Sequence, residues 1–148
     1  MILAHNAKIS VFCKEDENEA QILERFLALF PFSLGEEKLT IHRQKAVSFN
    51  ERMIIILELT LEKERHVKAF LRHLHDILPE RSRQIIISQR ESRLDENLHF
   101  YIRLDKEKWL KNEAWVTDDG NCYHINIGIA AFPAKREKAL QAVEQIFG

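Results

Sequence analysis

Residues 98–105, LHFYIRLD, together with residues 123–129, YHINIGI, decide the fold. In both stretches, apolar residues alternate with polar or aromatic ones, and this period of two is typical of a strand with one buried face. Two aspartates and a glycine at residues 118–120 precede the second stretch and are typical of a turn. The two stretches therefore predict two strands that bury one face each.

Three more strands are predicted nearer the N-terminus. Residues 8–14, KISVFCK, alternate with Ile9 and Val11 on one face. Residues 38–45 alternate in the same way, and residues 53–59 form a β-branched apolar run that suits a central strand. The sequence thus predicts five strands in all.

Two amphipathic helices are predicted between these strands. The first begins in the acidic segment after residue 14 and ends at Pro31. The second is capped by Thr60 and stops at Pro79. Their predicted apolar faces are Ala20, Leu23, Leu27 and Phe30 in the first helix, and Val67, Phe70, Leu71, Leu74 and Leu78 in the second.

The order of elements predicts an α+β protein, in which helices pack on one face of a mostly antiparallel sheet. Residues 80–94 suit either a short buried strand or a helix, and a short helix is favoured. Pro133 is expected in the first turn of a terminal helix that continues to the C-terminus. With 148 residues, the chain is expected to form a single domain over residues 1–148.

Composition and charge narrow the function classes. The net charge is −1, so no overall positive field draws this protein to nucleic acid. Residues 81–111 are an exception, since eight Arg and Lys face five Asp and Glu there, a net charge of +3. No apolar stretch approaches the roughly 20 residues that span a bilayer, so no membrane partner and a cytoplasmic location are expected. Cys13 and Cys122 form no zinc motif and are expected to be reduced thiols.

The two strands that decide the fold also carry the best candidate binding residues. If they pair, their polar and aromatic side chains share the face opposite the core, because strand side chains alternate. This mixture can stack bases, contact phosphates and reach base edges in single-stranded RNA. A solvated outer sheet face is the competing interpretation. The candidates are His99, Tyr101, Arg103, His124 and Asn126.

A second candidate group follows the first of these strands. Lys106, Lys108 and Lys111 surround Trp109 in the sequence, as in a patch that combines charge with stacking. The alternative is a short amphipathic turn with Trp109 anchored in the core, where large aromatic side chains usually lie.

A catalytic alternative would combine Asp105, Asp118, Asp119 and His124 into a metal or acid/base cluster. Adjacent aspartates followed by glycine and asparagine are far more often a turn. With four glycines, the chain also contains no phosphate-binding loop or dinucleotide motif. No catalytic residue, metal or cofactor is therefore expected.

Three longer motifs resemble an archaeal family of predicted RNA-binding proteins, described as exosome-associated and as similar in fold to the double-stranded-RNA-binding domain. Residues 14–30, KEDENEAQILERFLALF, resemble the opening of this family. Residues 93–110, RLDENLHFYIRLDKEKWL, resemble its signature of Arg-x-Asp, a strand and Arg-Leu-Asp-Lys. Residues 117–129, TDDGNCYHINIGI, resemble the Asp-led strand that follows. One departure is residues 41–50, IHRQKAVSFN, which lack the glycine and proline of the family's Gly-Asn-Pro segment.

The resemblance implies a two-layer fold like that of the double-stranded-RNA-binding domain, RNA as the partner, and roles for the charged residues of the signature. Arg93, Arg103 and Lys106 are the residues expected to contact RNA. Asp105 would repel phosphate, so it is expected to orient a neighbouring cation or cap the turn, and Asp95 is assigned an orienting role as well.

Three functional hypotheses follow, in order of preference. The first is an RNA-binding accessory protein, associated with RNA processing or degradation, that recognises backbone and shape without catalysis. The second is a protein-interaction or assembly module, serving a partner protein or a homodimer, without RNA affinity. The third is a metal-dependent nuclease, which requires Asp105, Asp118 and Asp119 to converge.

Overall fold

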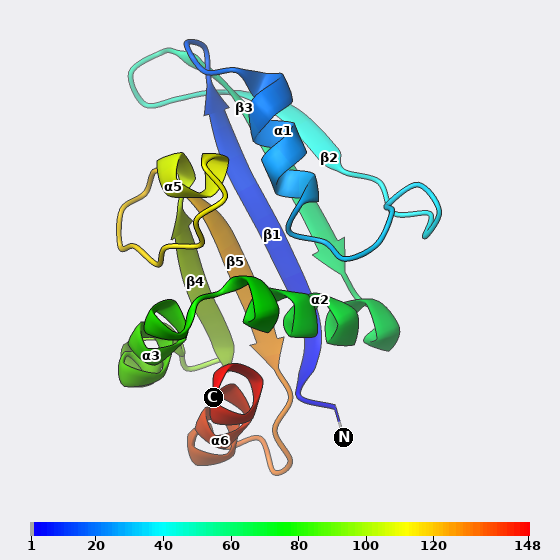
Figure 1. The fold of residues 1–148 in the computed structure, drawn as a ribbon, viewed down its shortest axis with the longest axis vertical. Coiled ribbons are helices and arrows are strands. Elements are labelled where there is room, and N and C mark those ends of the chain that lie inside the picture. Colours follow the sequence, from blue (N-terminus) through cyan, green and yellow to red (C-terminus); the bar gives the residue numbers. More distant parts are fainter. Residues whose placement is uncertain (1) are drawn as a thin grey trace.

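The computed structural model describes residues 2–148, in which five strands form one antiparallel sheet in the order β2-β3-β1-β5-β4 (Figure 1). The strands are β1 (Ala4–Lys14), β2 (His42–Val47), β3 (Met53–Leu61), β4 (His99–Asp105) and β5 (Cys122–Ile129). The helices are α1 (Glu19–Leu27), α2 (Glu64–Ile77), α3 (Glu80–Ser88), α4 (Arg90–Arg93), α5 (Lys106–Leu110) and α6 (Arg136–Phe147). The predicted α+β class with an antiparallel sheet is confirmed.

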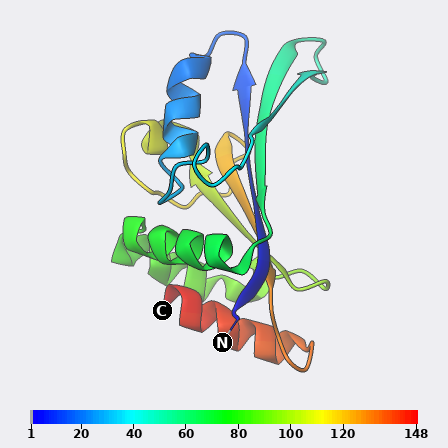
Figure 2. The same cartoon turned by 90° about the vertical axis from the view of Figure 1, so that its right-hand side faces the viewer.

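The helices lie on one side of the sheet and leave the other side open (Figure 2). Strand β1 is central and pairs on both edges, so that Ile9 lies opposite Leu59 of β3 and Ile125 of β5. All three side chains are buried under the helices, as the alternating pattern predicted. Phe12 of β1, which lies between the buried residues Val11 and Cys13, points to the open side and is 51% exposed.

The buried stripe of helix α1 lies one position away from the stripe predicted from the sequence. Asn18 caps the helix by accepting a hydrogen bond from the backbone N–H of Gln21 at 3.2 Å. The buried side chains of the helix are Ile22 and Phe26, whereas Leu27, predicted to be buried, is 41% exposed. The helix also ends at Leu27, before Pro31. Since apolar residues occupy both stripes, helical spacing alone did not decide between them.

The five predicted apolar residues of α2 are all buried, but the predicted cap is wrong. Thr60 lies inside β3, and Lys63 occupies the N-cap position of α2. Pro79 follows the helix and is the N-cap of α3. The strand expected over residues 38–45 begins only at His42, since Lys38 adopts a left-handed backbone with φ of 58° that interrupts an extended chain.

The ambiguous segment after Pro79 is helical, as favoured from the sequence. Ile86 of α3 is fully buried, and the hydroxyl of Ser82 donates to the carbonyl of Ala114 at 2.7 Å. The terminal helix α6 begins at Arg136, so Pro133 lies in the preceding turn and not in the first helical turn. Among the described residues, no helix is long and apolar enough to cross a membrane.

Candidate nucleic-acid interface

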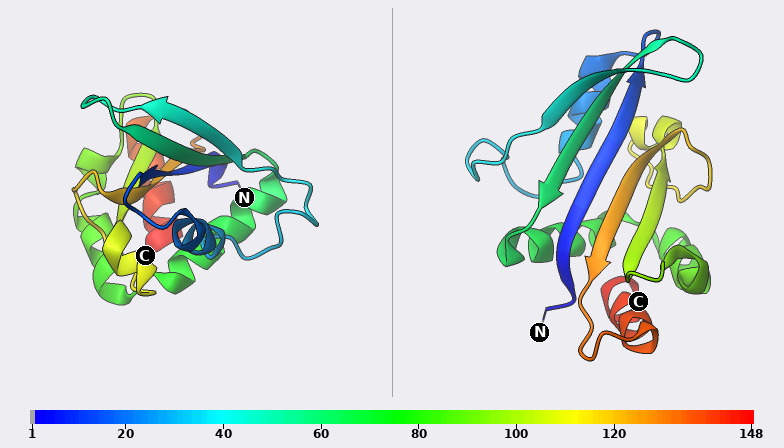
Figure 3. Two further views of the ribbon diagram at one scale, coloured as in Figure 1. Left: turned by 90° about the horizontal axis from the view of Figure 1, so that it is seen from above. Right: turned by 180° about the vertical axis from the view of Figure 1, so that it is seen from behind.

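The polar side chains of β4 and β5 alternate with buried ones and therefore lie on the open side of the sheet. This side faces the viewer in the right-hand view of Figure 3. The antiparallel register places Arg103 opposite His124 and Tyr101 opposite Asn126. His99 lies two residues before Tyr101, and its ring Nδ1 is 2.9 Å from Oδ1 of Asn126. The five candidates of the two strands therefore share one surface.

Tyr101 is held in the middle of a short row of rings. Its ring centroid lies 5.6 Å from that of His124 and 6.5 Å from that of His99. Its hydroxyl donates to Oδ2 of Asp95 at 3.1 Å. The other oxygen of Asp95 accepts from the backbone N–H groups of His99 and Asn97, both at 2.9 Å. Asp95 thus orients the Tyr101 side chain.

Hydrogen bonds to Asp95 stabilise its charged form. The backbone N–H of His99 is the main reason that the pKa of Asp95 lies below its ordinary value, and the Asn97 N–H and the Tyr101 hydroxyl act in the same direction. Burial, and then the bond to Asp95, raise the pKa of Tyr101, so its hydroxyl stays protonated. The Tyr101 hydroxyl therefore stays a hydrogen-bond donor, and the Asp95 carboxylate next to it stays negatively charged.

A surface hollow of about 590 Å³, called the cationic hollow below, opens beside this row. Its lining residues are Gln89, Ser92, Arg93, Tyr101, Arg103, Asp118 and His124. The Arg93 side chain is only 9% exposed. Its guanidinium donates to the amide oxygen of Gln89 at 3.1 and 2.5 Å and to the carbonyl of Tyr101 at 3.3 Å. These neutral acceptors hold Arg93 against the outer edge of β4.

The positive charge of the cationic hollow is only weakly compensated. Arg103 donates to the backbone carbonyl of Asp118 at 2.8 Å. The Asp118 carboxylate is 3.7 Å from the Arg93 guanidinium, and its side chain is 90% exposed. Burial and the neighbouring Arg103 lower the pKa of Arg93, although Asp118 opposes the shift. Because the hydrogen-bond acceptors of both guanidinium groups are neutral and the Asp118 carboxylate is solvent-exposed, the pair can still take a bidentate oxyanion such as phosphate.

His124 completes the cationic hollow as a neutral side chain. Burial, followed by the positive charges of Arg103 and Lys8, lowers the pKa of His124 from its ordinary value. At pH 7 the imidazole therefore offers one donor and one acceptor nitrogen.

Lys106 does not join this surface, which corrects the prediction that it contacts RNA. Its side chain is 2% exposed, and Nζ donates to the carbonyl of Phe12 at 2.6 Å and to the carboxylate of Glu17 at 3.0 Å. The ammonium is thus occupied between β1 and the turn before α1. The sequence around Lys106 gives no sign of this burial, because Phe12 and Glu17 lie about 90 residues away.

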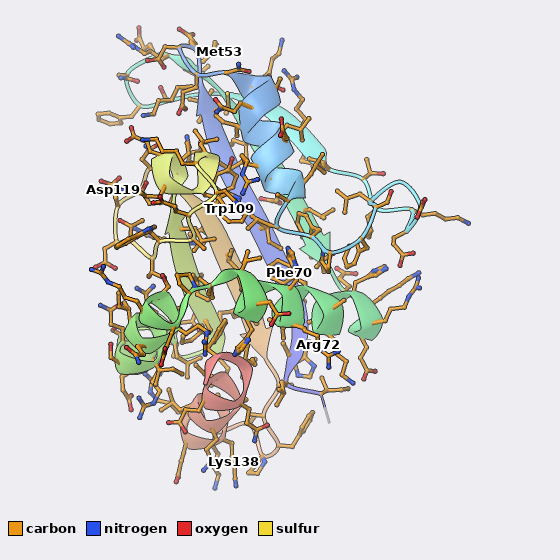
Figure 4. All side chains as sticks on the ribbon, in the orientation of Figure 1. Met53, Phe70, Arg72, Trp109, Asp119 and Lys138 are labelled. Atoms are coloured by element: carbon orange, nitrogen blue, oxygen red, sulfur yellow. The ribbon has the colours of Figure 1, made fainter. Side chains whose placement is uncertain are left out.

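Trp109 is also buried, in agreement with the alternative that anchors it in the core. It lies between α5 and α1 (Figure 4). Its indole N–H donates to the carbonyl of Arg25 at 2.7 Å, and the Arg25 guanidinium stacks over the ring at 4.2 Å. Asp105 caps α5 by accepting from the backbone N–H of Lys108 at 2.9 Å. Lys108 and Lys111 are exposed, so they are the members of this group that are open to a ligand.

The aspartates weighed as a metal site serve local structure. Asp105 is the cap just described, and Oδ1 of Asp119 accepts from the backbone N–H of Asn121 at 2.7 Å, as in a turn. Within residues 2–148, no three His, Cys, Asp or Glu side chains are grouped so as to hold a metal ion.

A second hollow of about 340 Å³, called the Phe12 hollow below, adjoins the first and was missed from the sequence. It shares Arg103 and His124 with the cationic hollow. Its other lining residues are Ser10, Val11, Phe12, Gly120 and Cys122. The sequence did contain a signal for it, because the large aromatic Phe12 occupies an outward position of the alternating segment KISVFCK.

Comparison with known proteins decides the family. A family model described as RNA binding matches residues 6–130, which include the whole open surface formed by β1, β4 and β5 except the first two residues of β1. The chain belongs to this RNA-binding family. A relative named RNA-binding protein PAB1135, from Pyrococcus abyssi, is 28% identical over 142 residues, which cover 96% of this chain and 92% of that protein.

Two solved structures share the fold of this RNA-binding family member. The protein AF2318 from Archaeglobus fulgidus is 26% identical and superposes with a TM-score of 0.84, over 97% of this chain and 99% of that one. Mth689 from Methanothermobacter thermautotrophicus is 25% identical, with a TM-score of 0.79 over 99% of each chain. The archaeal RNA-binding family implied by the sequence motifs is confirmed.

Proposed function

We propose that this protein binds RNA through the open face of its sheet and that the cationic hollow holds a backbone phosphate. One observation carries the proposal. Arg93 and Arg103 direct two guanidinium groups into one hollow on the open face, and the acidic side chain in its lining, Asp118, is 90% exposed and lies 3.7 Å from the Arg93 guanidinium. Guanidinium groups in this arrangement match the charge and bidentate geometry of phosphate.

The neighbouring groups extend the contact along the strand. Tyr101, fixed by Asp95, offers an aromatic edge, whereas His99 and His124 offer ring nitrogens for sugar or base atoms. Lys108 and Lys111 are exposed beyond the end of β4 and add positive charge. These groups recognise backbone and shape, and we propose that they do so without catalysis.

The finer implications of the sequence motifs are separate proposals. A role in RNA processing or degradation, an association with an exosome and a likeness to the double-stranded-RNA-binding domain rest on the motifs of residues 14–30, 93–110 and 117–129. Co-purification of the full chain with exosome subunits tests the association directly.

A self-association module is the second candidate, because apolar side chains are exposed at the tip between β2 and β3. Phe49 is fully exposed there, and Val47 and Met53 on either side are 65% and 41% exposed. Exposed apolar patches of this kind often mark protein contacts. Light scattering on the free protein, at the concentrations used for binding, distinguishes a monomer from a dimer formed through this tip.

The RNA proposal is tested by fluorescence anisotropy with a labelled single-stranded RNA across a salt series. Arg103→Gln removes one phosphate contact, so the affinity should fall about tenfold and the slope of log Kobs against log salt should become shallower by about 0.7. Lys138→Gln is the matched control, because it removes one positive charge from the exposed surface of α6 (Figure 4). Equal effects of the two substitutions, or no binding by the wild type at low salt, would overturn the proposal.

A further inference from the structure

The pairing between β1 and β5 stops where the Phe12 hollow begins. Their register runs from Ala4 to Val11, which lies opposite Tyr123. At the next residue, the carbonyl of Phe12 accepts the hydrogen bond from the Lys106 ammonium. On its other edge, Phe12 remains paired with Ile56 of β3. The sheet therefore opens beside Phe12, while the backbone of Phe12 is held from both sides.

The Phe12 hollow combines apolar lining with open access. Phe12, which is exposed, and Cys122, which is buried, both line it. Gly120 also lines it, and a Cβ added there would meet no heavy atom within 4 Å. A flat apolar group can thus enter from solvent and lie against the Phe12 ring.

The cationic hollow continues directly into this apolar one. Arg103 and His124 line both hollows, so a phosphate at Arg103 has an aromatic surface next to it. A nucleotide has this combination of parts, a charged phosphate joined to a flat base. Stacking on an aromatic side chain requires a free base face, which a base inside a duplex lacks because its neighbours cover both faces.

We propose that the Phe12 hollow binds one unpaired base of the RNA strand whose phosphate lies at Arg103. This inference rests on the proposed RNA-binding function and names its ligand class, namely RNA with a single-stranded segment. Phe12 suits the role because its backbone is fixed by Ile56 and Lys106, so that only its side chain loses conformational freedom when a base stacks on it.

The test compares a short single-stranded RNA with a blunt duplex of the same sequence, again by anisotropy. Wild-type protein should bind the single strand about tenfold more tightly than the duplex. Phe12→Ala should lose about tenfold for the single strand and nothing for the duplex, because only the former stacks. Phe12→Tyr keeps the ring and should restore tight binding.

Leu27→Ala is the matched control, since it truncates another exposed apolar side chain, on helix α1. The inference is overturned if Phe12→Ala behaves like Leu27→Ala, or if the duplex binds as tightly as the single strand. In those cases, a continued loss of affinity in Arg103→Gln keeps the RNA-binding function itself intact. Absence of any RNA binding removes both proposals.

Discussion

Replacing Lys106 by alanine is expected to lower the free energy of unfolding by about 3 kcal/mol. The substitution removes an ammonium that is 2% exposed and leaves the Glu17 carboxylate and the Phe12 carbonyl without their donor. Removing one partner of a buried ion pair costs about 3–5 kcal/mol, because the other charge stays buried. Glu17 retains 22% exposure, so partial hydration places the cost at the lower end of this range.

A double variant separates the unpaired charge from lost packing. Lys106→Met with Glu17→Gln removes both charges at nearly constant volume. The amide oxygen of the new glutamine side chain can still accept from the backbone N–H of Lys14, as the Glu17 carboxylate does at 2.9 Å. Since no isolated charge remains, this double variant should lie within about 1.5 kcal/mol of the wild type.

Urea unfolding at pH 7 measures both effects. With a slope of about 2 kcal/mol/M, the Lys106→Ala midpoint should fall by about 1.5 M. A loss below about 1 kcal/mol, or a double variant no more stable than Lys106→Ala, would refute the buried ion pair. Lys106 would then be solvated, and the original expectation that it contacts RNA would be open again.

Two further predictions concern titratable groups on the open face. Asp95→Asn should be less stable than the wild type at pH 7, because the lowered pKa of Asp95 means that its charged form stabilises the fold. This contribution is present above the unfolded pKa of about 3.9 and is lost as the pH falls through the lower folded value, so the thermal melts of the two proteins should draw together as the pH is lowered below about 3.9. For His124, the lowered folded pKa means that the unfolded chain binds its proton first as the pH falls. Stability should therefore decrease from pH 7 to pH 5, and it should decrease less in His124→Gln, whereas an equal decrease in both proteins would contradict the burial of this ring.

Part of the candidate interface could be predicted from the sequence because it depends only on strand periodicity. Once residues 98–105 and 123–129 are strands, Tyr101 and Arg103 must lie on the face opposite Phe100 and Ile102. The buried face of α2 followed from helical spacing in the same way. The motif of residues 93–110 pointed to the RNA-binding family that the comparisons confirmed.

Only the tertiary structure decided what surrounds each of these side chains. The burial of Lys106 depends on Phe12, 94 positions away, and that of Trp109 on Arg25, 84 positions away. The two hollows likewise exist because Arg93 of α4, the edge of β4 and the end of β1 meet at one corner of the open face. Local periodicity determines which way a side chain points from its own helix or strand. Contacts between distant segments determine whether that side chain is surrounded by solvent, by a charged group or by an aromatic ring.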